Sequence, residues 1–456
     1  MFARLENFIF EKMSETKLPS LSMAAIKNGE IIHARAFGFK DVGQGLAATP
    51  ATLYGIGSVT KSFTALAIMQ LSEQGKLSLD DPIDKYVPFS IKPKGETVRI
   101  SHFLSHTSGI PALAYAEAVI RGKTGAAENW LPIANCSDLL TFMGEAQDWS
   151  IARPGEKWFY LNEGYAILGN IIEKCSQMSY EEYVSNYILA PLGMNRSFFA
   201  KKEIDSDSDA AIPYVITRNG EQKASTYPFG GISADGALIS NVIDLSKYIS
   251  MYLGLGKYCD NRLLSEESVK LMQIPQISIP YQGYFGERSY AYGLFVTPDF
   301  LGSKLIDHGG SVLVSTAFMG FMPDKKIGIV LLANGSGYSL SQLGMMALSS
   351  MLGNDPEDLP FVRQEQALTE LTGAYETYRG TMKAQIKKMG SFLVIEMKDK
   401  YSDSIVPLIP QNIEKTRRTF YTLSSGATLT VEFMVHETGV ELIYERYLLR
   451  KTGKLL

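Results

Sequence analysis

The spacing of apolar residues divides the chain into a long mixed region and a shorter strand-rich region. Near the N-terminus, a short amphipathic helix-like segment precedes the runs LSMAAIK and IIHARAFGF, which meet at Asn28-Gly29 and predict a β-hairpin over 21–39. Helical periodicity dominates from residue 58 to about 286, and strand patterns return from Tyr290 in AYGLFV, KLIDHGG, VLVSTAFMGFM and IGIVLLAN. Strands at both ends of a helical insertion predict an α/β plus all-α unit with a cleft at the junction.

The pattern changes after the helix predicted at 340–352. The stretch Asp355-Pro-Glu-Asp-Leu-Pro360 has two prolines and three acidic residues, which cannot extend that helix and predict a linker over 355–370. Beyond Leu371, short alternating strands recur with Gly, Ser or Asn between them, which predicts an antiparallel β-barrel over 371–456. We therefore expect a catalytic domain over 1–354, a linker and a C-terminal barrel domain.

The predicted helix that starts at Ser58 carries the first candidate chemistry. Its residues are apolar on nearly all sides until Gly75, yet Lys61 lies three residues from Ser58 and so on the same face. The helix has no acidic residue before Glu73, and an unpaired buried amine has a lowered pKa. Such a lysine can take the proton of the serine hydroxyl. Ser-x-x-Lys also occurs at 14–17, where a capping serine and a surface lysine explain it.

Two further motifs each occur once. Tyr160-Leu-Asn162 stands between a loop and a helix-like run, where a tyrosine pressed against a cationic lysine is favoured as phenolate and can relay protons, and an amide can donate to a substrate carbonyl. His308-Gly309-Gly310 is predicted to open a strand, and its glycines would let an extended substrate approach the strand edge. Each motif alone also fits a packed loop aromatic or a structural histidine.

Composition restricts the compartment and the partners. The 456 residues are 45% hydrophobic and 20% charged, with a formal net charge of −4 and no basic block, so we expect a globular protein without a nucleic-acid partner. No apolar run reaches membrane-spanning length, and Glu6 and Glu11 interrupt the N-terminal segment, so we expect neither membrane contact nor a signal peptide. Cys136, Cys175 and Cys259 are odd in number and widely spaced, which favours reduced thiols and the cytoplasm. The five histidines lack zinc-like spacing, and we expect no metal and no cofactor.

Taken together, Ser58-x-x-Lys61, Tyr160-x-Asn162 and His308-x-Gly310 resemble the three active-site elements of the serine β-lactamase and penicillin-binding-protein superfamily, in particular its class C-like branch. The stretches LSHTSGIP (104–111) and GGISADGALISNVIDLSKY (230–248) also look like that branch, so the resemblance covers roughly residues 10–352. With a lipocalin-like barrel appended, the whole chain resembles the archaeal cube-forming serine peptidases of the CubicO group. The fold implied is a transpeptidase-like antiparallel sheet flanked by helices with an inserted helical subdomain.

The resemblance implies a role for each motif residue. Ser58 would be the nucleophile, Lys61 its general base and Tyr160 the proton relay. The oxyanion hole would consist of the backbone N–H groups of Ser58 and Ser311, and substrate would contact four further residues: Asn162, His308, Gly309 and Gly310. His308 replaces the lysine of the β-lactamases and is largely neutral at pH 7, which weakens recognition of a carboxylate. The resemblance also implies small peptide substrates, with D-residues among them, and a homo-octamer with enclosed active sites.

Two alternatives remain open at this point. The same scaffold supports an esterase, and the barrel could make the protein a non-catalytic ligand-binding module. Ser105 with His106, or Ser108 with His102, could in principle form another catalytic site, but the stretch 104–111 fits a packed turn better. Lys-Thr-Gly, the usual third element of the superfamily, occurs at Lys123 and Lys451, in a polar loop and five residues from the end of the sequence, and both are expected to be decoys.

Overall fold

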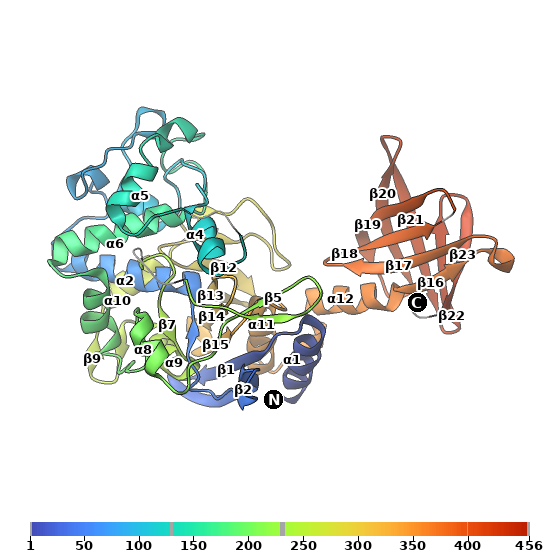
Figure 1. Ribbon diagram of the computed structural model, residues 1–456, viewed down its shortest axis with the longest axis horizontal. Helices are drawn as coiled ribbons and strands as arrows, with labels where there is room; N and C mark the ends of the chain where they lie inside the picture. Colours follow the sequence, from blue (N-terminus) through green and yellow to red (C-terminus); the bar gives the residue numbers. More distant parts are fainter. Residues whose placement is uncertain (1, 128–130, 229–232, 399, 454–456) are drawn as a thin grey trace. The chain divides into compact units, whose positions relative to one another are not determined.

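The computed structural model describes residues 2–127, 131–228, 233–398 and 400–453 (Figure 1). The chain folds into two compact units, Met1–Asn354 and Asp355–Leu456. The motif stretch 230–248 includes positions outside the described residues.

An antiparallel sheet forms the centre of the first unit. Within the described residues it has nine strands in the order β10-β11-β12-β13-β14-β15-β1-β2-β3. These strands are β1 (Ser20–Lys27), β2 (Glu30–Asp41), β3 (Leu46–Ala47), β10 (Ile277–Ser278), β11 (Ser289–Tyr290), β12 (Phe295–Phe300), β13 (Ser303–Ser311), β14 (Thr316–Met322) and β15 (Ile327–Ala333). β1 pairs with β15 from Leu21↔Ala333 to Lys27↔Ile327, so the N-terminal hairpin completes a sheet that the last strands of the unit begin. The predicted hairpin is confirmed: Asn28 and Gly29 both have positive φ, as a tight two-residue turn requires.

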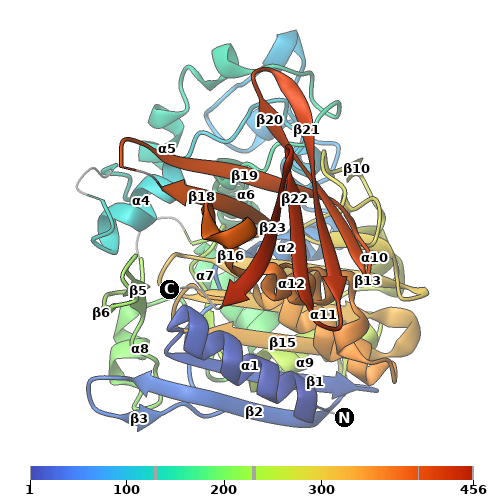
Figure 2. The ribbon, with the colours of Figure 1, turned by 90° about the vertical axis from the view of Figure 1, so that its right-hand side faces the viewer.

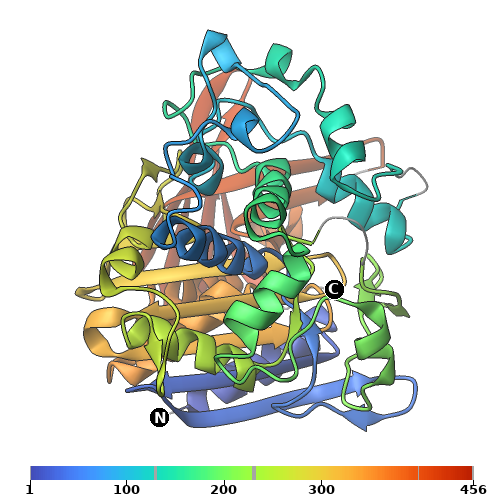
Figure 3. The ribbon, with the colours of Figure 1, turned by 90° about the vertical axis from the view of Figure 1, so that its left-hand side faces the viewer.

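Helices cover both faces of this sheet. α9 (Val242–Leu253) packs on β1, β14 and β15. α1 (Ala3–Thr16) and α11 (Leu340–Met351) lie on the opposite face, as Figures 2 and 3 show from the two sides. The inserted helical part contains α2 (Thr60–Glu73), α3 (Ile100–Leu104), α4 (Tyr115–Lys123), α5 (Cys136–Phe142), α6 (Asn162–Ser176), α7 (Tyr180–Val184), α8 (Lys201–Ser206) and α10 (Glu266–Met272). This arrangement confirms the predicted α/β plus all-α unit.

Three short strand pairs complete the described part of the first unit. They join β4 (Tyr54–Gly55) to β7 (Ile239–Ser240), β5 (Tyr214–Ile216) to β6 (Gln222–Ala224), and β8 (Lys257–Tyr258) to β9 (Asn261–Arg262). The first of these pairs holds the chain directly before Ser58 against the segment that leads into α9. It therefore fixes where the candidate nucleophile enters its helix.

The strands around His308 differ from the prediction. His308 does not open a strand: β13 begins five residues earlier, at Ser303, and ends at Ser311. The run VLVSTAFMGFM is not one strand either, because its first four residues form a tight turn in which the Val312 N–H donates to the Ser315 carbonyl at 3.0 Å. Leu313 takes a positive φ of 69° there, so an apolar residue occupies a turn position that the hydrophobic pattern assigned to a strand.

The second unit is a closed antiparallel barrel which, over its described residues, has eight strands. They are β16 (Gly373–Glu376), β17 (Lys383–Met389), β18 (Phe392–Lys398), β19 (Asp403–Ile413), β20 (Arg417–Ser424), β21 (Ala427–His436), β22 (Gly439–Tyr444) and β23 (Tyr447–Gly453). β16 pairs with β23, which closes the barrel and confirms the predicted architecture. Buried aromatic and aliphatic side chains, including Tyr375, Phe420 and Phe433, form its core.

The stretch predicted as a linker is ordered. Residues Pro356–Asp358 form a 3-10 turn, and α12 (Pro360–Leu371) follows directly. A proline is well tolerated in the first turn of a helix, so Pro360 starts α12 instead of marking a break. The end of α12 is held to the barrel by Arg418, which donates to the Ala367 carbonyl at 2.7 Å. No helix among the described residues is long and apolar enough to cross a membrane.

Candidate active site

Two glycines bring the turn that carries Ser58 against the end of β13. Ser58 lies in a 3-10 turn, Gly57–Val59, that leads into α2. A Cβ atom on Gly310 would lie 1.9 Å from the Ile56 carbonyl oxygen and 3.1 Å from the Ser58 nitrogen, and one on Gly57 would lie 2.6 Å from the Ser311 nitrogen. Only glycine fits at both positions. The backbone nitrogens of Ser58 and Ser311 therefore lie in the same small region.

Lys61 lies on the side of Ser58 that faces the protein interior. It is fully buried in α2, and its Nζ donates to Ser58 Oγ at 3.2 Å and to the Asp235 carbonyl at 2.6 Å. The same Nζ is 5.0 Å from the ring centroid of Tyr160 and 5.6 Å from that of Tyr165. Burial lowers the pKa of Lys61 to about 8. A substantial fraction of this amine is therefore neutral near pH 8 and able to accept the serine proton.

The lysine has acidic neighbours that the sequence did not indicate. Asp235, Glu117 and Glu163 each raise the pKa of Lys61 and so oppose the larger effect of burial. Asp235 is itself buried, and its carboxyl group accepts a hydrogen bond from Tyr115 Oη at 2.7 Å. The helix of Lys61 has no acidic residue before Glu73, as the sequence indicates, and the nearby carboxylate of Asp235 comes from a segment 174 residues away along the chain.

Tyr160 is a neutral phenol, not the phenolate that the sequence suggested. Burial raises its pKa well above the ordinary value of 10, and the neighbouring Ser58 side chain opposes this only in part. Its hydroxyl is buried and has no hydrogen-bond partner among the described residues. Burial disfavours the phenolate more than the charge of Lys61 can stabilise it, because burial also disfavours the charged form of Lys61.

The stretch 104–111 supports the Tyr160 loop. The Leu161 N–H donates to His106 Nδ1 at 3.0 Å, and the His106 and Tyr160 rings pack with their centroids 4.1 Å apart. Burial, together with the charge of Lys61, holds the pKa of His106 well below its usual 6.5. Ser105 Oγ donates to the Ser101 carbonyl and contacts the Thr107 hydroxyl at 2.8 Å, so it does not form the alternative pair with His106.

His308 is a buried, neutral imidazole. Its Nδ1 lies 2.7 Å from the Gly309 carbonyl, which can only accept, so Nδ1 carries the proton and Nε2 accepts from the Tyr290 hydroxyl at 3.0 Å. Burial lowers the pKa of His308 to about 3, and the cations of Lys61 and Arg288 act in the same direction. The imidazole is therefore uncharged at neutral pH, as the sequence suggested.

One cleft of about 720 Å³ brings the predicted site residues together. Lys61 lies beneath it, and seven predicted residues line it: Ser58, Tyr160, Asn162, His308, Gly309, Gly310 and Ser311. Asn162 is the first residue of α6. Neither Lys-Thr-Gly motif lines this cleft: Lys123 ends α4, and Lys451 belongs to β23 of the other unit.

The edge of β13 that faces away from β14 is open beside the nucleophile. β14 pairs with β13 up to Ser311, whereas β12 pairs with it only as far as Asp307. Over residues 308–311, no strand in the described part of the chain pairs with this second edge. An extended backbone segment can therefore add to the sheet there.

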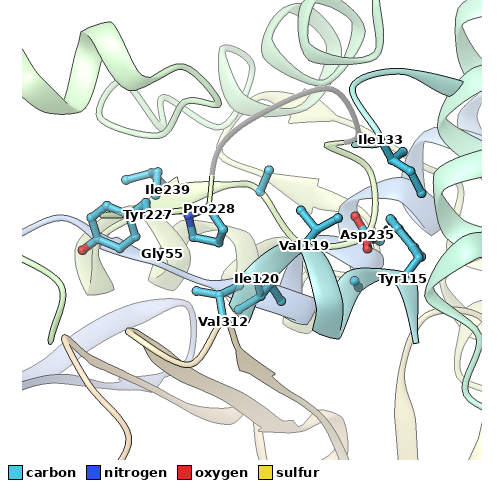
Figure 4. Close-up of a pocket in the computed structure, with 13 residues that line it drawn as sticks. Gly55, Tyr115, Val119, Ile120, Ile133, Tyr227, Pro228, Asp235, Ile239 and Val312 are labelled. Carbon is cyan, nitrogen blue, oxygen red and sulfur yellow. Dashed lines mark hydrogen bonds between the residues drawn. The ribbon is translucent and has the colours of Figure 1, made fainter. Parts of the chain in front are cut away.

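A small, mostly apolar cavity adjoins the cleft (Figure 4). It has a volume of about 60 Å³, and α4 contributes Val119 and Ile120 to its wall. Tyr227, Pro228 and Ile239 line the opposite part, and Asp235 with Tyr115 lies at one end. Ile120, Val312 and Asp235 line both spaces, so the cavity adjoins the candidate active-site cleft.

Comparison with known proteins gives two family matches. The β-lactamase family model matches residues 5–343, and the model of the Pab87 octamerisation domain matches residues 356–450. Protein flp of Staphylococcus aureus (strain NCTC 8325 / PS 47) is 30% identical over 338 residues, which cover 73% of this chain and 62% of that protein. The putative penicillin-binding protein PbpX of Bacillus subtilis (strain 168) is 27% identical over 292 residues, covering 64% and 65%. This chain thus spans about three-fifths of the length of the first of these relatives.

Two solved structures show the likeness in three dimensions. The octameric penicillin-binding protein homologue from Pyrococcus abyssi is 44% identical, with a TM-score of 0.94 over 98% of this chain and 99% of that chain. The penicillin binding protein from Bacillus halodurans shares the fold of the first unit, with 24% identity and a TM-score of 0.62 over 75% of this chain and 99% of that chain.

Proposed function

The chain belongs to the β-lactamase family of serine hydrolases, and from this membership we propose that it is a peptidase that cleaves short peptides through an acyl-enzyme. One observation carries the proposal. The Nζ of Lys61, with a pKa lowered to about 8, lies 3.2 Å from Ser58 Oγ at the floor of an open cleft. A serine with a neutral amine at hydrogen-bond distance is an activated nucleophile.

Acylation requires one nucleophile and three proton transfers. Neutral Lys61 accepts the hydroxyl proton as Ser58 Oγ attacks the scissile carbonyl, and the backbone N–H groups of Ser58 and Ser311 stabilise the oxyanion. Tyr160, as a neutral phenol beside Ser58, donates its proton to the departing amine when the C–N bond breaks. The lysine ammonium then returns a proton to the tyrosine. Deacylation reverses these transfers, with water as the nucleophile attacking the ester.

The substrate's backbone is held by the open edge of β13. An extended peptide pairs with residues 308–311, and Gly309, where a Cβ atom would meet no atom closer than 3.9 Å, leaves room for its close approach. The Asn162 amide donates to a substrate carbonyl across the cleft. The adjoining cavity of about 60 Å³ accepts a short apolar side chain. A peptide substrate therefore uses more of this site than a simple ester would.

The second unit points to assembly. Its residues 356–450 match the Pab87 octamerisation domain, and the 44% identical homologue is described as octameric. We propose that this chain also forms a homo-octamer in the cytoplasm and that the enclosed active sites admit peptides but not folded proteins. The buried apolar core of the barrel favours this structural role over the binding of a small molecule.

Covalent labelling tests the proposed nucleophile. After exposure to an activated fluorophosphonate, intact-mass spectrometry and peptide mapping should place one adduct on Ser58. Ser58→Ala should remove the adduct and lower the peptide and ester hydrolysis rates by about a thousandfold or more, or ~4 kcal/mol of barrier. Ser14→Ala is the matched control, because it changes the other Ser-x-x-Lys match and should alter neither result. Near-normal hydrolysis by Ser58→Ala would contradict the assignment.

A further inference from the structure

Asp235 contacts the proposed base through its backbone and not through its carboxyl group. Lys61 Nζ donates to the Asp235 carbonyl oxygen at 2.6 Å, whereas the Asp235 carboxyl group accepts from Tyr115 Oη at 2.7 Å. Only Cα and Cβ separate the carbonyl and carboxyl groups of an aspartate, so one change of rotamer can carry the carboxylate toward the amine. The hydrogen bond from Tyr115 prevents that change.

Tyr115 is fixed at its backbone as well as at its hydroxyl group. It is the first residue of α4, and Ala114 before it has a positive φ of 61°. This conformation is uncommon for a residue with a Cβ atom, so contacts must hold the start of the helix. The Tyr115 N–H has no partner within the helix and donates to Glu163 Oε1 at 3.3 Å. Glu163 is 1% exposed and lies in the first turn of α6, so both elements place the phenol.

The charges in this region make the direction of the Asp235 carboxyl group important. Burial raises the pKa of Asp235, and the charge of Lys61 is the main opposing effect. Burial also raises the pKa of Tyr115 well above 10, so its hydroxyl stays neutral and donates. A carboxylate that moved to within about 4 to 6 Å of Lys61 Nζ would favour the ammonium form and raise the lysine pKa by about 1 to 3 units. Such a lysine would be a poor base near neutral pH.

We propose that Tyr115 is a positioning residue of the acyl-transfer site, whose hydroxyl holds the Asp235 carboxyl group away from Lys61 and so keeps this lysine from forming a buried ion pair. The inference rests on the proposed acyl-transfer function and adds a residue on which the base depends. Figure 4 shows the two side chains concerned, Tyr115 and Asp235, at one end of the small cavity. Tyr115 therefore acts from the side of the cavity and not from the open edge of β13.

Other titratable groups also face Lys61. Burial lowers the pKa of Lys61, and Glu117 and Glu163 oppose this less than Asp235 does. Burial raises the pKa of Glu163 to about 7, so this carboxyl group titrates in the same pH range as the expected activity. Variants are therefore compared with Glu163 retained in each. The uncharged groups that face the amine from other elements are His106, His308, Tyr160 and Tyr165.

The pH dependence of Ser58 labelling by a fluorophosphonate tests the proposal. Tyr115→Phe removes only the hydroxyl group, and the midpoint of the labelling rate should rise from near pH 8 by about one unit or more. Labelling at pH 7 should then be about tenfold slower or more, while the rate reached at high pH stays the same. With Asp235→Asn already present, Tyr115→Phe should leave the midpoint in place, because no carboxylate is released.

Tyr180→Phe is the matched control. Tyr180 and Tyr115 are each 3% exposed, and the Tyr180 hydroxyl contacts Thr64 of α2 at 2.8 Å without holding a carboxyl group. Its loss should not move the midpoint. A shift of equal size for Tyr115→Phe with and without the Asp235 carboxyl group would overturn the proposal. So would a lower rate at high pH with an unchanged midpoint, because that result describes a purely structural residue.

Asp235→Asn alone gives an independent result if Tyr115→Phe does not fold. It removes the acid with the largest effect on Lys61, so the midpoint of labelling should fall. An unchanged or higher midpoint would show that the carboxyl group does not act on the amine and would overturn the proposal.

A direct measurement of the lysine separates this inference from the proposed function. In protein made with isotope-labelled lysine, the ε-carbon NMR signal that is missing from Lys61→Arg reports the pKa of Lys61 without any reaction. Tyr115→Phe should raise that pKa by the same amount as the midpoint. If Ser58 forms no adduct, the proposed function fails, and this signal still supports or overturns the role of Tyr115. If Ser58 is labelled and Tyr115→Phe moves neither quantity, the inference fails and the proposed function stands.

Discussion

At the scale of single residues, the protonation state of Lys61 controls the proposed reaction. Its pKa is lowered to about 8, so the neutral form that can act as a base becomes populated as the pH rises through that value. The charged form predominates below it. The rate of serine acylation should therefore follow the deprotonation of this one amine.

The expected result is a fluorophosphonate labelling rate that rises about tenfold per pH unit below pH 8 and levels off above it. Fluorophosphonate labelling reports attack by the Ser58 hydroxyl and does not depend on peptide binding. The labelling rate constant should therefore be measured as a function of pH. Lys61→Arg should react at least a hundredfold more slowly at every pH, because a guanidinium stays protonated. A profile that does not change between about pH 6 and 9, or an active Lys61→Arg variant, would show that another group is the base.

The residues around Lys61 also show what local sequence can predict. The contact between Ser58 and Lys61 is predictable because a spacing of three residues fixes their positions on one helical turn. The ionisation of Tyr160 is not, because a motif does not reveal how deeply its phenol is buried. Asp235 lies in a stretch that the sequence marks only as a motif. Its role as an electrostatic partner is missed because the contact with Lys61 depends on tertiary structure alone.

At the scale of secondary-structure elements, the contact between the Ser58 turn and β13 positions the proposed oxyanion hole. The contact requires Gly310, since a Cβ atom there would meet the Ile56 carbonyl at 1.9 Å. Gly310→Ala should push the two elements apart, lower the free energy of unfolding by about 1 to 3 kcal/mol and slow labelling of Ser58 by at least a hundredfold.

Thermal unfolding and labelling rates together check this expectation. The neighbouring Gly309 provides the control for stability, because the nearest atom to a Cβ on Gly309 would be 3.9 Å away and Gly309→Ala should unfold at nearly the wild-type temperature. Labelling of Gly310→Ala at the wild-type rate would show that the close approach of these elements is not needed for acylation.

Elements bounded by residues typical of a turn or a helix start are predicted well, and elements without such residues are not. The Asn28-Gly29 turn indicates its hairpin because few residues adopt two successive positive φ angles. The turn between β13 and β14 uses Leu313 at positive φ and contains no glycine, so its sequence resembles a strand. The helix α12 is not anticipated within the predicted linker because the prediction treats Pro360 as a break, although a proline is equally suited to a first helical turn.

At the scale of the whole molecule, the closed barrel limits how chains can associate. Its strands pair around the full circle, so it presents no free strand edge over its described residues and must contact other chains through side chains. Exposed apolar side chains on its described surface include Ile405 at 61% and Leu423 at 70% exposure. These are the groups that a partner copy would bury.

We expect the double variant Ile405→Asp/Leu423→Asp to lower the particle mass measured by light scattering from that of an octamer to a smaller species. Charges placed in an apolar interface lose hydration without gaining a partner. Phe10→Asp changes a comparably exposed aromatic residue of the first unit and should leave the mass unchanged. A full-length wild-type protein that runs as a monomer would contradict the proposed assembly.

The position of β1 within the central sheet has a consequence for biosynthesis. β1 pairs with β15, and the Ser20 N–H donates at 2.8 Å to the side-chain oxygen of Asn334, 314 residues later in the chain. At ordinary translation speeds this partner emerges about 15 to 60 s after β1. The barrel strands, by contrast, pair mainly with their neighbours in sequence and can form soon after they are made. Because β13 is also synthesised late, a growing chain carries Ser58 and Lys61 long before it has the strand that would stabilise an oxyanion. We therefore expect the proposed acyl transfer to begin only after nearly all of the first unit has been translated.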